Sequence, residues 1–161
     1  MSLAIRQARP GDAGIVLTLV RELAVYEKLE HEVVATEAMI DEALFGAHPR
    51  LFSDIAEWNG EPVGFTLWFY NFSSFAGRHG IYLEDLYVRE ALRGKGIGKA
   101  LITRLARRCV DENLARFEWS VLDWNTPSIN FYKAMGAELM DEWTVCRVSG
   151  EALKRLAERG I

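Results

Sequence analysis

A glycine-rich turn offers the clearest chemistry in the sequence. It covers residues 93–99, reads Arg-Gly-Lys-Gly-Ile-Gly-Lys, and lies between a predicted strand and a predicted helix. Glycine lacks the Cβ atom that would keep a ligand away from the backbone, and the first N–H groups of a helix have no partner inside it. Because the helix dipole and the neighbouring basic side chains also favour negative charge, the turn is predicted to bind a phosphate or pyrophosphate.

Two common phosphate-binding motifs do not fit this turn. A P-loop requires a glycine where the chain has Arg93, and a serine or threonine where it has Ala100. The dinucleotide-binding fingerprint, started at Gly94, requires a third glycine where the chain has Lys99. Both nucleotide-binding classes are therefore excluded.

Hydrophobic periodicity predicts the elements that position the turn. Alternating apolar runs predict strands at residues 3–8, 51–58, 62–70, 81–88, 117–122 and 143–148. Helical spacing predicts helices at about 13–29, 36–45, 95–111 and 126–135, and one more after Ser149. The resulting order is β-α-α-β-β-β-α-β-α-β plus a C-terminal helix, which places an antiparallel meander before a βαβ unit and indicates an α/β (α+β) fold.

Capping and turn residues support these boundaries. Asp12, Thr36 and Asn125 are the expected N-caps. The pair Asn59-Gly60 predicts a two-residue hairpin turn.

The turn and the order of elements together resemble the GNAT superfamily of N-acetyltransferases, whose coenzyme A pyrophosphate loop has this glycine pattern. Four further segments resemble the diamine (spermidine/spermine) and thialysine N-acetyltransferase branch. They are residues 22–27, 45–49, 81–88 and 124–133. The resemblance covers nearly the whole chain. It implies a single GNAT domain over residues 1–161, with a central mixed, mainly antiparallel sheet and helices on both faces.

The resemblance also implies acetyl-CoA as co-substrate and no metal. The positions that match the family's cofactor-binding residues are Leu86, Tyr87, Val88, Arg93, Gly94, Lys95, Gly96, Ile97, Gly98, Lys99, Asn125 and Ser128. Transfer is expected to be direct, because the chain lacks a G-x-S-x-G elbow and neither cysteine lies in a motif that lowers its pKa.

Two residues match the family's catalytic positions. An alkylamine with a pKa of about 10.4 is almost fully protonated near pH 7, so a base must remove its proton. The resemblance assigns this role to Glu84, acting through water or directly, and assigns Tyr132 as the acid that protonates the leaving thiolate. The alternative interpretations are an ordinary exposed strand carboxylate and an aromatic side chain that packs a helix on the sheet.

The amine site is implied to contain Tyr26, Glu27, Glu84 and Asp85. Carboxylates beside an aromatic ring suit an ammonium group through charge pairing and cation–π contact. The expected substrate is a primary amine of a small cationic metabolite: a diamine, a polyamine or a lysine analogue. The chain has Leu122-Asp123 where the branch often has Ala-Glu, so the amine itself stays open.

Composition limits the other possibilities. The 161 residues are half apolar, which suits one folded domain. The sequence has neither an apolar run long enough for a membrane span nor a secretory h-region, and a cytoplasmic location is expected. Cys109 and Cys146 form no C-x-x-C pair and are expected to be reduced and buried, and the three histidines show no metal-ligand spacing.

Two alternative functions remain open. One is acetylation of a protein lysine or N-terminus, and the other is a non-catalytic acyl-CoA-binding module. Residues 89–108 carry a net charge of +6 within a chain of net charge −4. The pyrophosphate site accounts for this basic window, so nucleic-acid binding is disfavoured. The family further implies a homodimer.

Overall fold

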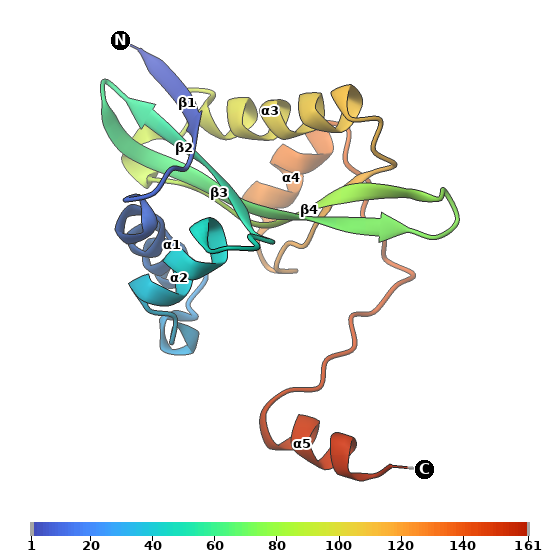
Figure 1. The fold of residues 1–161 in the computed structure, drawn as a ribbon. Coiled ribbons are helices and arrows are strands. Elements are labelled where there is room, and N and C mark those ends of the chain that lie inside the picture. Colours follow the sequence, from blue (N-terminus) through green and yellow to red (C-terminus); the bar gives the residue numbers. More distant parts are fainter. Residues whose placement is uncertain (1, 161) are drawn as a thin grey trace. The chain divides into compact units, whose positions relative to one another are not determined.

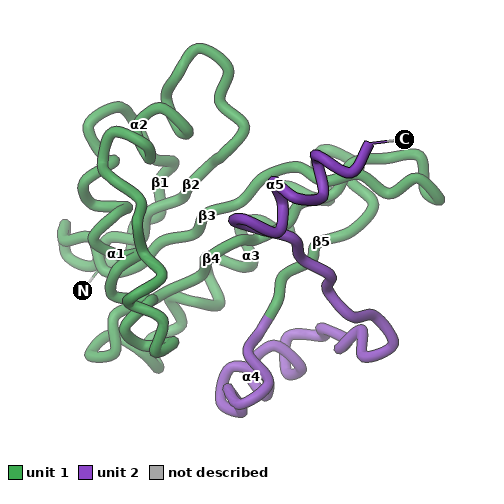
Figure 2. Tube along the Cα trace, turned by 90° about the horizontal axis from the view of Figure 1, so that it is seen from below, with its two compact units in different colours: residues 1–120 green, residues 121–161 purple. Residues whose placement is uncertain are grey.

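The structure, a computed structural model, describes residues 2–160. It forms two units, Met1–Ser120 and Val121–Ile161 (Figure 2).

The first unit is built on a five-stranded sheet in the order β1-β2-β3-β4-β5. The strands are β1 (Leu3–Gln7), β2 (Phe52–Trp58), β3 (Glu61–Ser73), β4 (Arg78–Val88) and β5 (Phe117–Trp119). Pairing is antiparallel from β1 to β4 and parallel between β4 and β5. The sheet is therefore mixed and mainly antiparallel, as predicted.

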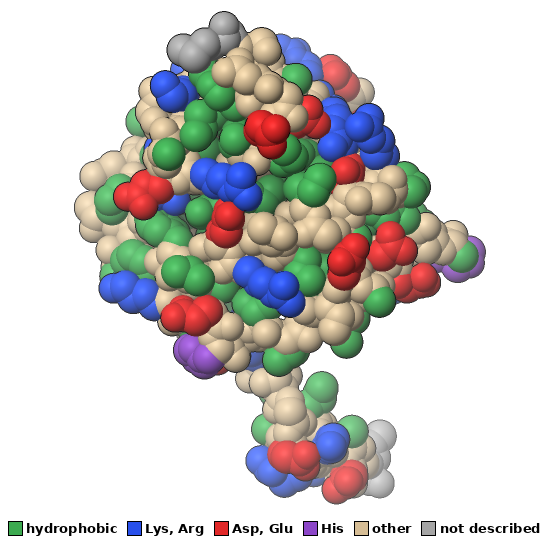
Figure 3. Space-filling view, turned by 90° about the vertical axis from the view of Figure 1, so that its left-hand side faces the viewer, with side chains coloured by type: hydrophobic (Ala, Val, Ile, Leu, Met, Phe, Trp, Pro, Cys, Tyr) green, Lys and Arg blue, Asp and Glu red, His purple; other side chains and the backbone are tan. Residues whose placement is uncertain are grey.

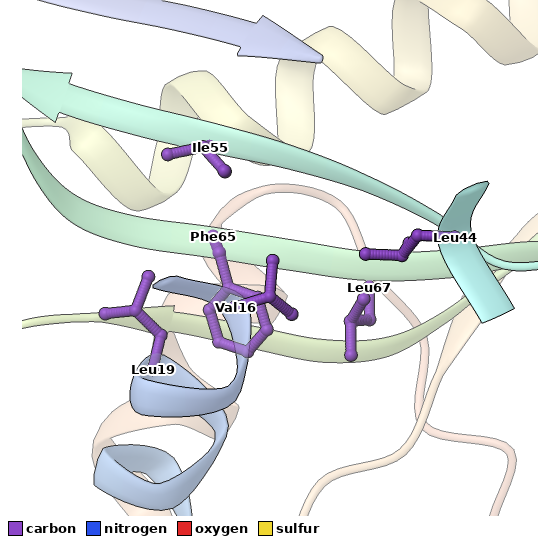
Figure 4. Packing of buried hydrophobic residues seen from close by; sticks show 6 residues of the cluster. All are labelled: Val16, Leu19, Leu44, Ile55, Phe65 and Leu67. Carbon is purple, nitrogen blue, oxygen red and sulfur yellow. The ribbon is translucent and has the colours of Figure 1, made fainter. Parts of the chain in front are cut away.

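Helices cover both faces of this sheet, which confirms the predicted layers (Figure 1). Helices α1 (Ala13–Tyr26) and α2 (Glu37–Phe45) pack on one face, and α3 (Ile97–Asp111) packs on the other. Two short 3₁₀ helices, Glu30–Glu32 and Glu90–Leu92, lie in the connections. On the α1 side, six apolar residues form one buried cluster: Val16, Leu19, Leu44, Ile55, Phe65 and Leu67 (Figure 4).

The hairpins differ in length from the prediction. At the β2–β3 turn, Asn59 and Gly60 both have positive φ, at 52° and 86°, as a two-residue turn requires. Strands β3 and β4 extend further than predicted, so that only residues 74–77 connect them.

Helix α1 ends at Tyr26 rather than near residue 29, and Lys28 beyond it has a φ of 61°.

The structure confirms some of the predicted N-caps but not all of them. The Thr36 hydroxyl accepts the Met39 N–H at 3.2 Å, as expected. Asp12 precedes α1 but makes no capping bond within the helix. Its carboxylate instead pairs with Arg6 on β1 at 2.6 Å and accepts the Arg9 N–H. The hydrogen bond from Arg6 lowers the pKa of Asp12.

The Thr36 cap can be tested by substitution. Thr36→Ala should reduce the free energy of unfolding by about 1 kcal/mol, because the first turn of α2 loses an acceptor for one of its N–H groups. Urea unfolding measures the change. Thr36→Ser keeps the hydroxyl and should remain within a few tenths of a kcal/mol of wild type; an equal loss in both variants would contradict the capping role.

The second unit contains α4 (Thr126–Ala134) and α5 (Gly150–Glu158). Asn125 caps α4 as predicted, since its side-chain oxygen accepts the Ser128 N–H at 3.3 Å. The strand predicted at residues 143–148 is wrong: these residues form neither helix nor strand. Alternation alone does not make a strand, because the backbone also needs a neighbouring strand to pair with. Cys146 in this segment is exposed rather than buried, whereas Cys109 on α3 is half-buried.

The surface mixes charges of both signs. On the face in Figure 3, basic and acidic side chains alternate with apolar ones. Among the described residues, no helix is long and apolar enough to cross a membrane.

Candidate active site

A β-bulge in β4 is the centre of the site. Leu67 of β3 lies opposite Asp85, while the next residue of β3, Trp68, lies opposite Leu83. Glu84 is therefore an extra residue in β4, with no partner of its own on β3. Bulges of this kind often re-aim side chains next to active sites.

The bulge changes which backbone N–H groups of β4 point towards β3 and which point away from it. Before it, the Ile81 N–H bonds the Arg116 carbonyl on the β5 side at 3.1 Å. After it, the Arg89 N–H bonds the Val63 carbonyl at 2.8 Å, so Asp85, Tyr87 and Arg89 face β3. The N–H groups of Leu86 and Val88 consequently point away from β3.

Among residues 2–160, no strand pairs with that edge of β4 after residue 83. In the part of the chain that the structure describes, the β4–β5 ladder ends at the Leu83–Trp119 pair. The Val88 carbonyl accepts a hydrogen bond from Arg93 Nε at 2.9 Å. The N–H groups of Leu86 and Val88 thus lie along an open strand edge, where they can donate to a ligand.

The bulge also places two carboxylates on one face of the sheet. Leu83 and Leu86, on either side of the acidic pair, both pack in the α3-side core. Tyr87 packs on the α1 side. Because Glu84 and Asp85 fall between two α3-facing residues, both carboxylates lie away from α3.

Asp85 has the most perturbed carboxyl group of the site. Burial, together with the negative charges of Glu84 and Glu27, raises the pKa of Asp85 to about 7. Glu27 follows the last residue of α1, and partial burial raises its pKa as well. Glu84 is exposed. The three acids form a cluster that favours either a bound cation or a shared proton, and Asp85 titrates where a general base at neutral pH is most useful.

Tyr26 links this cluster to the glycine-rich turn. It is the last residue of α1, immediately before Glu27. The Arg93 guanidinium lies over the Tyr26 ring, 4.6 Å from its centroid, and 5.7 Å from the centroid of Tyr87.

The turn itself has the geometry of an anion site. Gly94 and Gly96 have φ values of 78° and 80°, and Gly96 is the N-cap of α3, which begins at residue 97 rather than 95. A Cβ at either glycine would meet no protein atom within 4 Å, so these glycines serve the backbone conformation and leave room for a ligand. The N-terminus of α3 and the exposed Lys95 and Lys99 suit a diphosphate.

The remaining predicted residues belong to the second unit. Asn125 and Ser128 form the cap of α4, and Tyr132 lies in the same helix, with its ring 5.5 Å from that of Phe131. The first unit brings Glu27 and Glu84 close to Asp85, and it places the Tyr26 ring against Arg93 of the turn. Among the described residues, no group of three or more histidine, cysteine or acidic side chains could hold a metal ion.

The sequence analysis placed Asp85 in substrate binding only and did not anticipate the raised pKa of its carboxyl group. A signal was present in the strand pattern: Ile81, Leu83, Leu86 and Val88 are spaced by two, three and two residues. The three-residue step breaks the alternation of a regular strand and marks the bulge.

Comparison with known proteins identifies the family. The acetyltransferase (GNAT) family model matches residues 17–137. The chain belongs to the GNAT family. It is accordingly an N-acetyltransferase, and GNAT acetyltransferases use acetyl-CoA, whose diphosphate is the kind of group predicted to bind at the turn.

Curated relatives of this GNAT enzyme act on amines. The chain is 39% identical to a thialysine N-epsilon-acetyltransferase of Sus scrofa, over 97% of this chain and 98% of that protein. It is 32% identical to an L-ornithine N5-acetyltransferase of Arabidopsis thaliana, over 98% and 89%. Both alignments are nearly full-length.

Solved structures confirm the GNAT fold. An integron cassette protein of V. cholerae superposes with a TM-score of 0.82 at 27% identity, over 98% of this chain and 99% of that one. An aminoglycoside N-acetyltransferase in complex with CoA superposes with a TM-score of 0.72 at 19% identity, over 91% and 95%.

Proposed function

We propose that this enzyme acetylates a primary amine of a small cationic metabolite, with a diamino acid such as thialysine or ornithine, or a diamine or polyamine, as acceptor. The observation that carries the proposal is the cluster of Glu27, Glu84 and Asp85, with Tyr26 next to Glu27 at the end of α1. An ammonium group would relieve the mutual repulsion of these carboxylates. The names of the relatives from Sus scrofa and Arabidopsis thaliana support the same class of acceptor.

The acetyl thioester supplies the acyl group, and this chain supplies the base that makes the amine nucleophilic. Asp85, with a pKa of about 7, is suited to take the ammonium proton at neutral pH, and the exposed Glu84 passes it to water. The sequence assigned the base to Glu84 alone; we propose that the Glu84–Asp85 pair acts together. Attack by the neutral amine is direct, without an acyl-enzyme.

Four further sets of groups complete the proposed chemistry. The N–H groups of Leu86 and Val88 on the open edge of β4 would donate to the acyl oxygen as it becomes negative. The turn at residues 93–99 and the α3 N-terminus would bind the diphosphate, and Asn125 and Ser128 would bind the pantetheine arm. Tyr132 would give its phenolic proton to the leaving thiolate. The family match extends from residue 17 to residue 137, which supports the proposal that residues 1–161 act as one domain.

A protein acceptor is the alternative with the same chemistry. The side chain of a lysine in a folded protein or peptide presents one positive charge within a neutral backbone. Diamines and polyamines carry two or more positive charges, and a free diamino acid carries two ammonium groups and one carboxylate. The acidic cluster therefore favours the small amine. A non-catalytic module is disfavoured because the chain keeps Glu84, Asp85 and Tyr132.

We also propose that the enzyme is a homodimer and lies in the cytoplasm. Sedimentation measures the oligomeric state, and cell fractionation measures the location.

Release of free coenzyme A thiol tests the proposal. Purified enzyme with acetyl-CoA would be assayed against thialysine, ornithine, lysine, spermidine, a short diamine and a lysine-containing peptide. Turnover with at least one of the small amines, at a higher kcat/KM than with the peptide, is expected. Thiol release with the peptide alone would refute the small-amine acceptor.

A further inference from the structure

Arg93 connects the glycine-rich turn to the proposed amine site. Its Nε donates to the Val88 carbonyl at 2.9 Å, and its guanidinium lies 4.6 Å from the centroid of the Tyr26 ring. These contacts direct the side chain from the turn towards the end of α1. Arg93 therefore touches the aromatic ring proposed for the amine while its backbone begins the turn proposed for the diphosphate.

Arg93 differs from its neighbour Arg89 in whether a carboxylate balances its positive charge. Arg89 donates to both carboxylate oxygens of Glu22 on α1, at 3.0 and 3.2 Å, so its charge is balanced locally. Arg93 forms no ion pair with a carboxylate of the described residues, and the contacts it makes are with a carbonyl and two aromatic rings. The positive charge of Arg93 therefore lies against the Tyr26 ring before any ligand binds.

This charge opposes an ammonium group at the same ring. A cation already on an aromatic ring reduces the attraction of that ring for a second cation, and the two charges also repel each other directly. A diphosphate at the turn brings negative charge next to Arg93, Lys95 and Lys99, and this charge offsets the repulsion. The amine should therefore bind more strongly once the cofactor is in place.

We propose that Arg93 couples the two substrate sites, because its charge weakens amine binding at Tyr26 until the diphosphate of the cofactor neutralises the turn. The inference rests on the proposed function, which places the amine at Tyr26. Coupling between two ligands is reciprocal, so the amine must also strengthen cofactor binding by the same factor.

Calorimetric titration measures this factor without turnover when CoA replaces acetyl-CoA. The amine probe is thialysine, or spermidine if it is the faster substrate. In wild type, saturating CoA should lower the Kd of the amine about fivefold or more. Arg93→Met should bind the amine more tightly than wild type when CoA is absent, and its coupling factor should fall below twofold. Arg93→Lys keeps the charge and should keep most of the coupling.

Two controls separate coupling from damage to the fold. Lys95 lies with its ammonium 5.6 Å from the Trp58 ring centroid rather than at Tyr26. Lys95→Met should weaken CoA binding and leave the amine affinity of the free enzyme unchanged. In wild type, the coupling factor should shrink at 0.5 M salt, because screening weakens interactions between exposed charges.

Specific results would overturn the inference. One such result is a coupling factor in Arg93→Met as large as that of wild type. The other is weaker amine binding by Arg93→Met than by wild type in the absence of CoA, which would indicate a purely structural role. Failure of the proposed function has a different signature: wild-type enzyme would release no thiol with any small amine, and the inference would fall with it.

Discussion

Asp85→Asn is expected to lower kcat at pH 7 by about 100-fold or more, because the variant loses the group that accepts the ammonium proton. Wild-type kcat/KM for the amine should fall on the acid side of a pKa near 7, where Asp85 becomes protonated. The Asp85→Asn variant should not show this decrease of kcat/KM at acid pH. A variant with wild-type turnover and an unchanged profile would remove Asp85 from the proposed role.

The same substitution should stabilise the protein above neutral pH. The pKa of Asp85 is about 7 in the folded chain, against a reference value of 3.8. Between these values the folded chain holds a proton that the unfolded chain has released, so stability falls as pH rises from about 4 to about 7. Asp85→Asn removes this loss and should raise the free energy of unfolding at pH 8 by roughly 2–4 kcal/mol, with little change at pH 4.

Glu84→Gln is the matched comparison for the change in stability and for the pH profile. Glu84 is exposed, so its removal should change the free energy of unfolding much less than Asp85→Asn does. Because the charge of Glu84 contributes to the raised pKa of Asp85, the acid limb of the Glu84→Gln profile should move to lower pH. An Asp85→Asn variant that is less stable than wild type at pH 8 would contradict a raised pKa of the Asp85 carboxyl group in the folded chain.

Tyr132→Phe is the second substitution with a large expected effect. The ring remains, but the phenolic proton proposed for the leaving thiolate is lost, so kcat should fall about 100-fold. The Kd of acetyl-CoA should stay within about twofold of wild type, as titration calorimetry would measure. Phe131→Leu alters the neighbouring ring of α4 and should leave kcat within about threefold. Equal losses in both variants would indicate a packing role for Tyr132.

The sequence was most informative where local chemistry determines structure. The turn at residues 93–99 was recognisable because glycine spacing, basic side chains and a following helix coincide in one short segment. Thr36 and Asn125 behave as caps because a cap depends only on residues three positions away. Asp12 failed as a cap because Arg6, on another element, offers its carboxylate a stronger, charged donor.

Features that depend on distant segments were less predictable. The strand expected at residues 143–148 has the right alternation, but alternation does not supply a neighbouring strand. The raised pKa of Asp85 requires Glu27 of another element to be close, and no local pattern reports that distance. The direction of the Arg93 side chain likewise depends on where α1 ends.

A competition experiment tests the central claim most directly. Thialysine, ornithine, spermidine and a lysine-containing peptide would be mixed at equal concentration with acetyl-CoA and enzyme, and the acetylated products would be quantified by mass spectrometry. The product ratios report the ratios of kcat/KM, which is how an enzyme discriminates between substrates. We predict that an acetylated small amine exceeds the acetylated peptide by about tenfold or more. Predominant acetylation of the peptide would contradict an acidic site built for small cationic amines.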